Sequence, residues 1–244
     1  MKRLFTLVAL CMLSVATFAQ KDVTKFLGIP VDGTKTQMIQ KLKAKGFIYN
    51  QQKDVLLGEF NGEKVEVRVQ TQGNKVWRLA VSDVTMRDEG QIKIRYNRLI
   101  SQFKNNENYI ALSENEPLSE DEDISYNISV YNKQYEATFY QKPDFDSAQY
   151  ANMLQEKYAN EFNRINEYKA KFSEEELANP QGELKANIEK IQEWVMEIMQ
   201  KETAELLNNV YKKLVWFTIN DIYGRYVITM FYENGYNEAN GSDL

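Results

Sequence analysis

The stretch GIPVDGTKT, residues 28–36, comes close to the glycine-rich loop that binds nucleotide phosphates. In that loop a lysine directly follows the second glycine, so its ammonium group and the backbone amides converge on the same phosphates. Here Thr34 separates Gly33 from Lys35, and Pro30 stands where a backbone donor is needed. The spacing therefore argues against a nucleotide site, and we expect a helix to begin here instead.

The chain contains no histidine, which excludes Ser-His-Asp and Cys-His catalysis and imidazole zinc sites. A reaction would have to use carboxylates, lysine, tyrosine or serine. Two carboxylates about 5–10 Å apart can hydrolyse a glycosidic bond without histidine. Glu66 and Glu136 are the candidates, because both alternate onto the polar face of predicted strands. A carboxylate-dependent glycan hydrolase is therefore one alternative.

The first residues, MKRLFTLVALCMLSVATFAQ, predict a secretory signal peptide over residues 1–19. Lys2 and Arg3 precede an apolar run that is shorter than the roughly 20 residues needed to span a bilayer. A lipoprotein signal at Cys11 is the competing interpretation, but Leu10 stands where a small residue is expected. We expect an exported protein, periplasmic or extracellular, with no transmembrane anchor in the mature chain.

Cleavage after residue 19 would remove the single cysteine and change the net charge from −5 to −7, since Lys2 and Arg3 leave with the leader. A chain this acidic is not expected to bind nucleic acid. The acidic run SENEPLSEDED lacks the ordered spacing of a calcium loop, so we expect a solvated loop there. No metal, nucleotide or other cofactor is predicted.

The first part of the chain predicts one helix followed by a three-stranded antiparallel meander. Thr34 and Gln37 match a capping box, and Gly46 fits the left-handed position that follows a helix. Three segments then alternate with a period of two, as strands with one buried face do. Asn61-Gly62 and Gly73-Asn74 are turn signals between them. The predicted strands are DVLLGEF, KVEVRVQ and KVWRLAVSD, with Trp77, Leu79 and Val81 on one face of the last.

A second round of helix and strands follows. Apolar residues recur at helical spacing after a predicted cap at Thr85 and Asp88; they are Ile92, Tyr96, Leu99 and Phe103. The segments ISYNISVY, residues 124–131, and KQYEATFY, residues 133–140, alternate about Asn132-Lys133 and are predicted as strands. The order of helix and strands occurs twice, which suggests a degenerate repeat.

Residues 146–212 lose strand character and predict a helical hairpin, broken at Asn179-Pro180-Gln181-Gly182. Its second helix carries a narrow apolar seam at heptad-like steps, formed by Leu184, Ile188, Ile191, Val195 and Ile198. Two alternatives stay open for the hairpin: it folds back on the sheet, or it is a projecting arm that binds a partner.

The predicted fold class is α+β, with antiparallel meanders covered by amphipathic helices and an inserted helical hairpin. LVWFTI and RYVITMFY form a last hairpin that completes the sheet. The expected organisation is a signal peptide at 1–19, the first part of the sheet domain at 20–145, the helical insertion at 146–212 and the C-terminal β-hairpin at 213–244.

Several stretches resemble a family of uncharacterised exported proteins of anaerobic gut bacteria. They are the leader ending Phe18-Ala19-Gln20, KFLGIPVDGTKTQMIQKLKAKGF, NKVWRL, EDEDISY, YEATFYQ and ITMFYENGYNEANGSDL. The resemblance implies export and a single integrated unit, and it supplies no site residue. The repeated helix and meander are also similar to small periplasmic proteins of the beta-lactamase-inhibitor type, an analogy of fold alone.

The leading hypothesis is a non-catalytic binding or protein-interaction module of the cell envelope. If helices cover the apolar face of the sheet, the opposite face presents Arg68, Arg78, Tyr131, Glu136 and Tyr140. Tyrosine and arginine together suit protein interfaces and sugar stacking alike, so a protein or glycan ligand is expected. A third hypothesis makes the chain a structural subunit that assembles through its helical hairpin.

Overall fold

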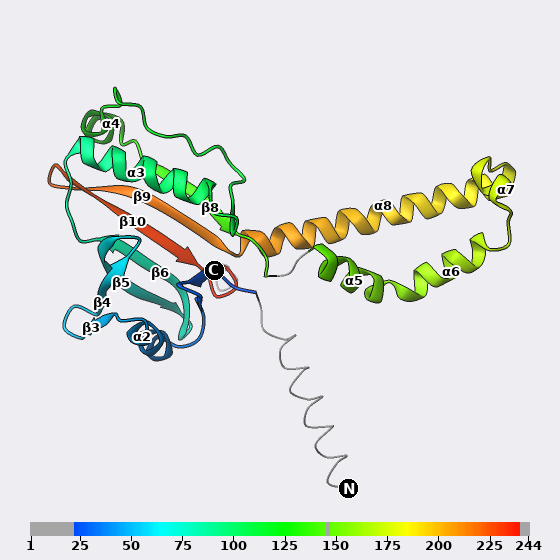
Figure 1. Ribbon diagram of the computed structural model, residues 1–244, viewed down its shortest axis with the longest axis horizontal. Helices are drawn as coiled ribbons and strands as arrows, with labels where there is room; N and C mark the ends of the chain where they lie inside the picture. The colour runs from blue at the N-terminus through cyan, green and yellow to red at the C-terminus, as the bar shows by residue number, and fades with distance from the viewer. Residues whose placement is uncertain (1–21, 145–146, 240–244) are drawn as a thin grey trace, which may run out of the picture. The chain divides into compact units, whose positions relative to one another are not determined.

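The computed structural model describes residues 22–144 and 147–239 (Figure 1). The predicted signal peptide lies outside these residues. The chain divides into two compact units: the first ends at Lys142 and resumes at Tyr211, and the second is Pro143–Val210. In the part of the chain described, no helix combines the length and apolar character needed to cross a membrane.

The first unit is built on an eight-stranded antiparallel sheet, which confirms the α+β class. The C-terminal hairpin lies in its middle, because β10 pairs with β6 and β9 pairs with β8. The hairpin thus joins the early meander to the later strands. In sheet order the strands are β3 (Ile48–Asn50), β4 (Val55–Phe60), β5 (Glu63–Gln72), β6 (Lys75–Asp83), β10 (Arg225–Glu233), β9 (Leu214–Ile222), β8 (Glu136–Gln141) and β7 (Tyr109–Ile110).

A separate two-stranded ribbon, β1 (Lys25–Phe26) and β2 (Ile29–Pro30), precedes the sheet. Phe26 on this ribbon is completely buried. Its ring lies 4.9 Å from that of Tyr232 on β10 and 4.9 Å from that of Phe60 on β4. The ribbon therefore closes one end of the core.

The two predicted hairpin turns have the backbone conformation that their residues favour. Asn61 and Gly62 both have positive φ, and so do Gly73 and Asn74. Two residues with positive φ make the type I′ turn, whose twist matches that of the flanking strands. The predicted turns at both positions are confirmed.

The predicted face of Trp77 is wrong. Gln70 pairs with Arg78 and Thr71 pairs with Val76, so Trp77 has no partner on β5 and forms a β-bulge. The extra residue reverses the alternation, and Val76 instead of Trp77 enters the core. The Trp77 ring lies against the Arg78 guanidinium, whose carbon is 4.0 Å from the ring centroid.

Helix α2 (Lys35–Ala44) begins as predicted. Thr34 accepts a hydrogen bond from the Gln37 backbone, and Gln37 reciprocates, which is a complete capping box. Gly46, with φ of 95°, follows the end of the helix in the left-handed conformation. The opening glycine-rich stretch therefore starts a helix.

Helix α3 (Glu89–Lys104) begins three residues later than predicted, with Asp88 and Gln91 as its capping box. The reason lies in Arg87, which forms an isolated antiparallel bridge with Tyr226. Backbone hydrogen bonds in both directions hold this residue extended, so the helix cannot start at Thr85.

Residues 124–131 form helix α4 (Ile124–Tyr131), so the predicted strand is wrong. Asp123 caps the helix by accepting a hydrogen bond from the Tyr126 backbone, and Asn132 ends it in the left-handed conformation. Ile124 is buried and Ile128 packs on the core. These two residues are four apart, a spacing that fits a helix face and a strand face equally.

Helices α2 and α3 cover one face of the sheet, and α3 lies along β10 and β9 (Figure 1). The core forms between this face and the helices. It contains Met38 and Leu42 from α2, Ile92, Tyr96, Leu99 and Phe103 from α3, and Val65, Val67, Leu79, Val81, Phe139, Val215, Phe217, Ile228, Met230 and Tyr232 from the sheet.

A buried ion network stabilises the end of β6. Asp83 accepts hydrogen bonds from Arg87 Nη1 at 2.9 Å and from Arg95 Nε at 3.1 Å. Arg87 also pairs with Glu63 at 2.7 Å. The network holds two acids and two arginines, so its charges balance within the unit.

The second unit consists of helices, as the predicted insertion requires. The five seam residues of its long helix, from Leu184 to Ile198, are all half-buried. Among its described side chains, Glu202 and Val210 are the ones that are buried. The helices are α5 (Ser147–Lys157), α6 (Ala159–Lys169), α7 (Glu174–Ala178) and α8 (Gly182–Tyr211).

Glu202 ties two of these helices together. Its carboxylate accepts hydrogen bonds from Lys157 Nζ at 2.8 Å and from the Tyr158 hydroxyl at 2.5 Å. The Tyr150 hydroxyl donates to its backbone carbonyl at 3.2 Å. The hydrogen bond from Lys157 is the main reason that the pKa of Glu202 is lowered.

Candidate functional site

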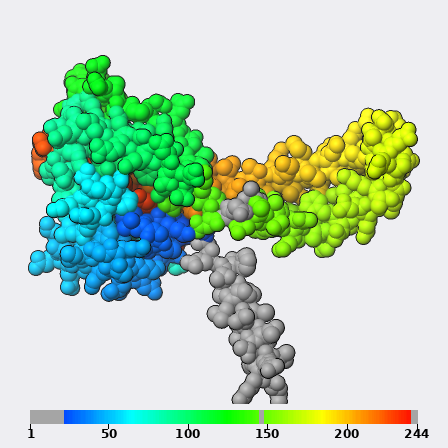
Figure 2. Space-filling model, viewed as in Figure 1, coloured from blue at the N-terminus to red at the C-terminus, as the bar shows by residue number. Residues whose placement is uncertain are grey.

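A cleft of about 620 Å³ opens in the first unit, above β10 and between the β4–β5 hairpin and the C-terminal half of α3. Figure 2 shows red atoms of β10 at its bottom, between cyan residues of the hairpin and green residues of α3. This volume is within the range of small-molecule sites. The lining residues are Leu27, Glu59, Phe60, Asn61, Leu99, Ser101, Gln102, Phe103, Asn105, Asn106, Tyr109, Met230 and Tyr232.

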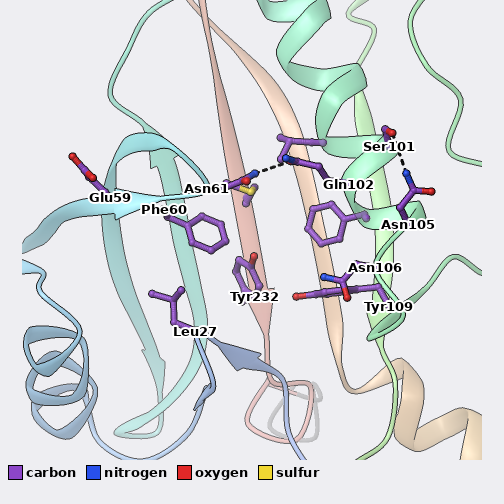
Figure 3. Close-up of a pocket in the computed structure, with 13 residues that line it drawn as sticks. Leu27, Glu59, Phe60, Asn61, Ser101, Gln102, Asn105, Asn106, Tyr109 and Tyr232 are labelled. Atoms are coloured by element: carbon purple, nitrogen blue, oxygen red, sulfur yellow. Dashed lines mark hydrogen bonds between the residues drawn. The ribbon is translucent and has the colours of Figure 1, made fainter.

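Aromatic rings form the floor and two sides of the cleft (Figure 3). Phe60 lies on one side, with its ring 6.3 Å from that of Tyr232 on the floor. Tyr109 lies on the other side, with its ring edge-on to Phe103 at 4.8 Å. Tyr232 and Phe103 are buried, whereas Phe60 and Tyr109 are partly exposed. The last two therefore offer the accessible ring surface.

The local sequence explains these positions. Phe60 ends β4 directly before the Asn-Gly turn, so the turn places Asn61 at the mouth. On α3, Leu99 and Phe103 are four residues apart and both point inward. Gln102 then lies at the exposed edge of the same helix. Successive residues of a strand alternate between the two faces of a sheet, and the lining residues of β10 lie on its helix-covered face.

Side-chain amides form the rim. Asn61 Nδ2 donates a hydrogen bond to Gln102 Oε1 at 2.8 Å, which bridges the hairpin and α3 across the mouth (Figure 3). Asn105 Nδ2 donates to Ser101 Oγ at 3.4 Å. Glu59 is the charged residue among the described lining, and its carboxylate is directed outward in Figure 3.

The two cleft tyrosines stay protonated. Burial raises the pKa of Tyr232 well above its ordinary value, and burial also raises the pKa of Tyr109. Gln141 Nε2 donates to the Tyr109 hydroxyl at 3.0 Å and also to the Lys25 carbonyl at 2.7 Å. The aromatic rings of the cleft can therefore stack against a ligand, and its neutral polar groups can form hydrogen bonds with that ligand. Its described lining offers no pair of carboxylates for acid-base catalysis.

Four of the five predicted binding residues share the face of the sheet opposite the helices. Strand register puts Glu66, on β5, in one row with Ser82, Thr229, Thr218 and Glu136. Arg68 and Arg78 alternate onto the same face of β5 and β6, and Tyr140 onto the same face of β8. We call this the open face.

Tyr131 does not belong to the open face. It ends helix α4, where it is 67% exposed, and its ring meets that of Tyr126 edge-on at 5.6 Å. The wrong strand assignment of residues 124–131 is the cause of this error.

Arg78 lies in an aromatic cluster on the open face. Its Nη2 pairs with Glu233 Oε1 at 2.6 Å, and Trp216 Nε1 donates to the same oxygen at 2.6 Å. The rings of Trp216 and Phe231 stack at 4.1 Å. Arg78 is thus held by its own neighbours, whereas Arg68 is exposed and lies 3.6 Å from the Glu66 carboxylate.

The structure does not bring Glu66 and Glu136 together. Three strands separate β5 from β8, so four inter-strand spacings of roughly 4.8 Å put the two acids about 19 Å apart. Glycoside hydrolysis needs carboxyl groups within about 10 Å of each other. This pair therefore does not form a hydrolase site.

Sequence reasoning missed the cleft. Tyr109 lies in a segment predicted as loop, and Phe103 is indistinguishable from an ordinary core residue in the helical pattern. Phe60 directly before Asn61-Gly62 is the one available signal, because a turn next to an aromatic residue places that ring at the end of a strand.

Comparisons with family models, with curated proteins and with solved structures find no match to this chain. In the described residues, no group of three or more acidic side chains is placed to hold a metal ion. The geometry of the cleft is therefore the main indication of function.

Proposed function

We propose that this chain is an exported cell-envelope protein that acts as a non-catalytic binding module, with its ligand in the cleft above β10. The observation that carries the proposal is the combination of accessible rings, Phe60 and Tyr109, with a rim of side-chain amides. Apolar pockets with a few converging polar groups are the usual form of ligand sites.

Export is part of the proposal because of the leader pattern at residues 1–19. The first unit has a continuous core of its own, so it does not depend on disulfides. Export of a cysteine-free mature chain is compatible with a core of this size.

Interaction with a partner through the open face or through the helical hairpin stays a prediction. Arg78 is engaged with Glu233 within the chain, which makes it a poorer contact for a partner. The cleft is the better site because it is concave and offers the partly exposed rings of Phe60 and Tyr109 below its polar rim.

Amide NMR spectra of residues 20–244 test the proposal. Soluble glycan and peptide fractions of the cell envelope are added, and the signals that shift are mapped. We expect the shifts at the cleft, around Phe60 and Gln102. Shifts confined to the open face or to the helical unit would contradict the proposal.

A matched pair of substitutions on α3 provides the control. Ser101→Trp fills the cleft, whereas Ile94→Trp adds the same ring at a position of α3 that is 61% exposed and does not line the cleft. The first variant should lose the ligand-induced shifts, and the second should keep them. Equal responses of the two variants would reject the cleft.

The hydrolase alternative has a separate test. Incubation with peptidoglycan and plant glycans should release no sugar above the blank, because Glu66 and Glu136 are too far apart to act together. Sugar release that disappears in Glu66→Gln would restore that alternative.

A further inference from the structure

We infer that the ligand of the cleft is a neutral saccharide, a chain of rings that carry hydroxyl groups and no charge. This inference rests on the proposed function and names its ligand class. Ring geometry, rim chemistry and charge support it independently.

The accessible rings suit a flat ligand with apolar faces. Phe60 and Tyr109 come from β4 and β7 and stand on opposite sides of the cleft, with Tyr232 between them (Figure 3). Aromatic faces pack well against C–H groups, and the C–H face of a pyranose ring is such a surface. A sugar ring can therefore lie between the two side chains while its hydroxyl groups point to the rim.

The side-chain amides of the rim have the hydrogen-bonding groups that suit ligand hydroxyls. A side-chain amide both donates and accepts hydrogen bonds, as a sugar hydroxyl does. Asn61 and Gln102 bond to each other across the mouth, and Asn105 bonds to Ser101. Ligand hydroxyls can replace the Asn61–Gln102 hydrogen bond without leaving either amide unsatisfied, so ligand entry carries little penalty there.

The charges around the cleft disfavour anions. No lysine or arginine is among the described lining residues, and Glu59 adds a carboxylate at the mouth. The C-terminal end of α3 also borders the cleft at Asn105 and Asn106, and a helix C-terminus carries partial negative charge. Phosphorylated, sulfated or uronic acid ligands would meet repulsion without a compensating cation among the described lining residues.

Amide NMR titrations with defined probes test the inference. The neutral probes are cellohexaose, maltohexaose and mannohexaose; the others are oligogalacturonate, a proline-rich decapeptide and spermidine. We expect at least one neutral oligosaccharide to shift the signals of the cleft, and oligogalacturonate to leave them unchanged.

Two variants and a control check the contacts. Phe60→Leu keeps an apolar side chain but removes the ring, and Gln102→Ala removes a rim amide; each should weaken binding about tenfold, the effect of about 1.4 kcal/mol. Tyr131→Leu removes an exposed ring on α4 and should leave the affinity unchanged. Melting curves of all variants verify folding.

The outcomes separate this inference from the proposed function. If the peptide, spermidine or oligogalacturonate shifts the cleft signals while no neutral oligosaccharide does, the neutral saccharide would be overturned as ligand. That result would still support a binding module. Saccharide binding that Phe60→Leu does not weaken would also overturn the inference. No cleft response to any probe or to any envelope fraction would overturn both.

Discussion

The side-chain amide of Asn115 binds both backbone polar groups of Thr138. Asn115 Nδ2 donates to the Thr138 carbonyl at 2.7 Å, and the Thr138 N–H donates to Asn115 Oδ1 at 2.9 Å. Asn115 thereby takes the place of a neighbouring strand along β8. Asn97 pairs in the same way with the backbone of Leu118. The long loop before α4 is fixed by these two clamps, and the outer edge of β8 is covered.

Asn115→Leu tests this clamp. The substitution keeps the shape of a buried side chain but leaves the Thr138 backbone unpaired, which should cost about 1–3 kcal/mol of unfolding free energy. Denaturant titration measures the loss. Light scattering should also detect association at high concentration, because an uncovered strand edge pairs with other chains.

Asn163→Leu is the control for this prediction, since Asn163 is exposed on α6. Its effect should stay within about 0.5 kcal/mol. Equal destabilisation by the two variants would show that the clamp has no special role.

Asp83→Asn is predicted to be strongly destabilising. Asp83 is buried between Arg87 and Arg95, and Arg95 Nη1 already lacks a hydrogen-bond partner. Removal of the carboxylate charge leaves two buried guanidinium groups undercompensated, at a cost of about 3–5 kcal/mol.

Denaturant titration of Asp83→Asn beside Asp54→Asn checks the effect of burial. Asp54 pairs with Lys35, but its side chain is 52% exposed, and an exposed pair contributes about 1 kcal/mol or less. A loss for Asp83→Asn no larger than that for Asp54→Asn would contradict the role of the buried network.

Glu202 makes the stability of the helical unit depend on pH. Lys157 and Tyr158 lower the pKa of Glu202 by hydrogen bonds to its carboxylate. A lowered folded-state pKa gives stabilisation that is complete above the unfolded pKa of about 4.3 and is lost as the pH falls through the folded value. Glu202→Gln should therefore be less stable than wild type at pH 7, and the difference should shrink in acid.

Circular dichroism melting at pH 7 and near pH 3 measures this effect. Glu205→Gln is the control, because the Glu205 side chain is 57% exposed and lies 3.6 Å from the same lysine. A stability difference between Glu202→Gln and wild type that is the same at both pH values would refute the electrostatic explanation.

Tyr223→Asn is predicted to stabilise the protein. Tyr223 and Gly224 form the two-residue turn between β9 and β10, and Tyr223 has φ of 54° although it is fully exposed. Asparagine tolerates this conformation better, so the gain should be about 0.5–1 kcal/mol.

The reverse change, Asn74→Tyr, tests the same reasoning, because Asn74 has φ of 63° in an equivalent turn. This variant should be destabilised by a similar amount in thermal unfolding. A lower melting temperature for Tyr223→Asn would show that the turn conformation is not the deciding factor.

Local signals predicted much of this fold. The capping box of Thr34 and Gln37 and the Asn61-Gly62 turn act over a few residues, so the sequence contains the whole cause. Residues 124–131 were assigned wrongly because the spacing of Ile124 and Ile128 fits both the helical and the strand period. The cap at Asp123 is what favours the helix. The bulge at Trp77 depends on pairing with β5, which a single segment does not reveal.

The candidate site was less predictable. Phe60, the segment with Phe103 and Tyr109, and Tyr232 are separated by long stretches of chain and meet because the C-terminal hairpin enters the middle of the sheet. That topology follows from long-range pairing. The alternation of β5 did predict which residues share the open face, but it did not show that Glu66 and Glu136 lie four strands apart.

The central claim, that the cleft binds the ligand, is tested most directly by methionine methyl NMR. Met230 lines the bottom of the cleft, whereas Met153, Met196 and Met199 are exposed in the helical unit. On addition of a bound ligand, the Met230 methyl signal should shift because the surrounding rings reorganise, and the other three should stay in place. Shifts at the helical methionines with an unchanged Met230 signal would contradict the account.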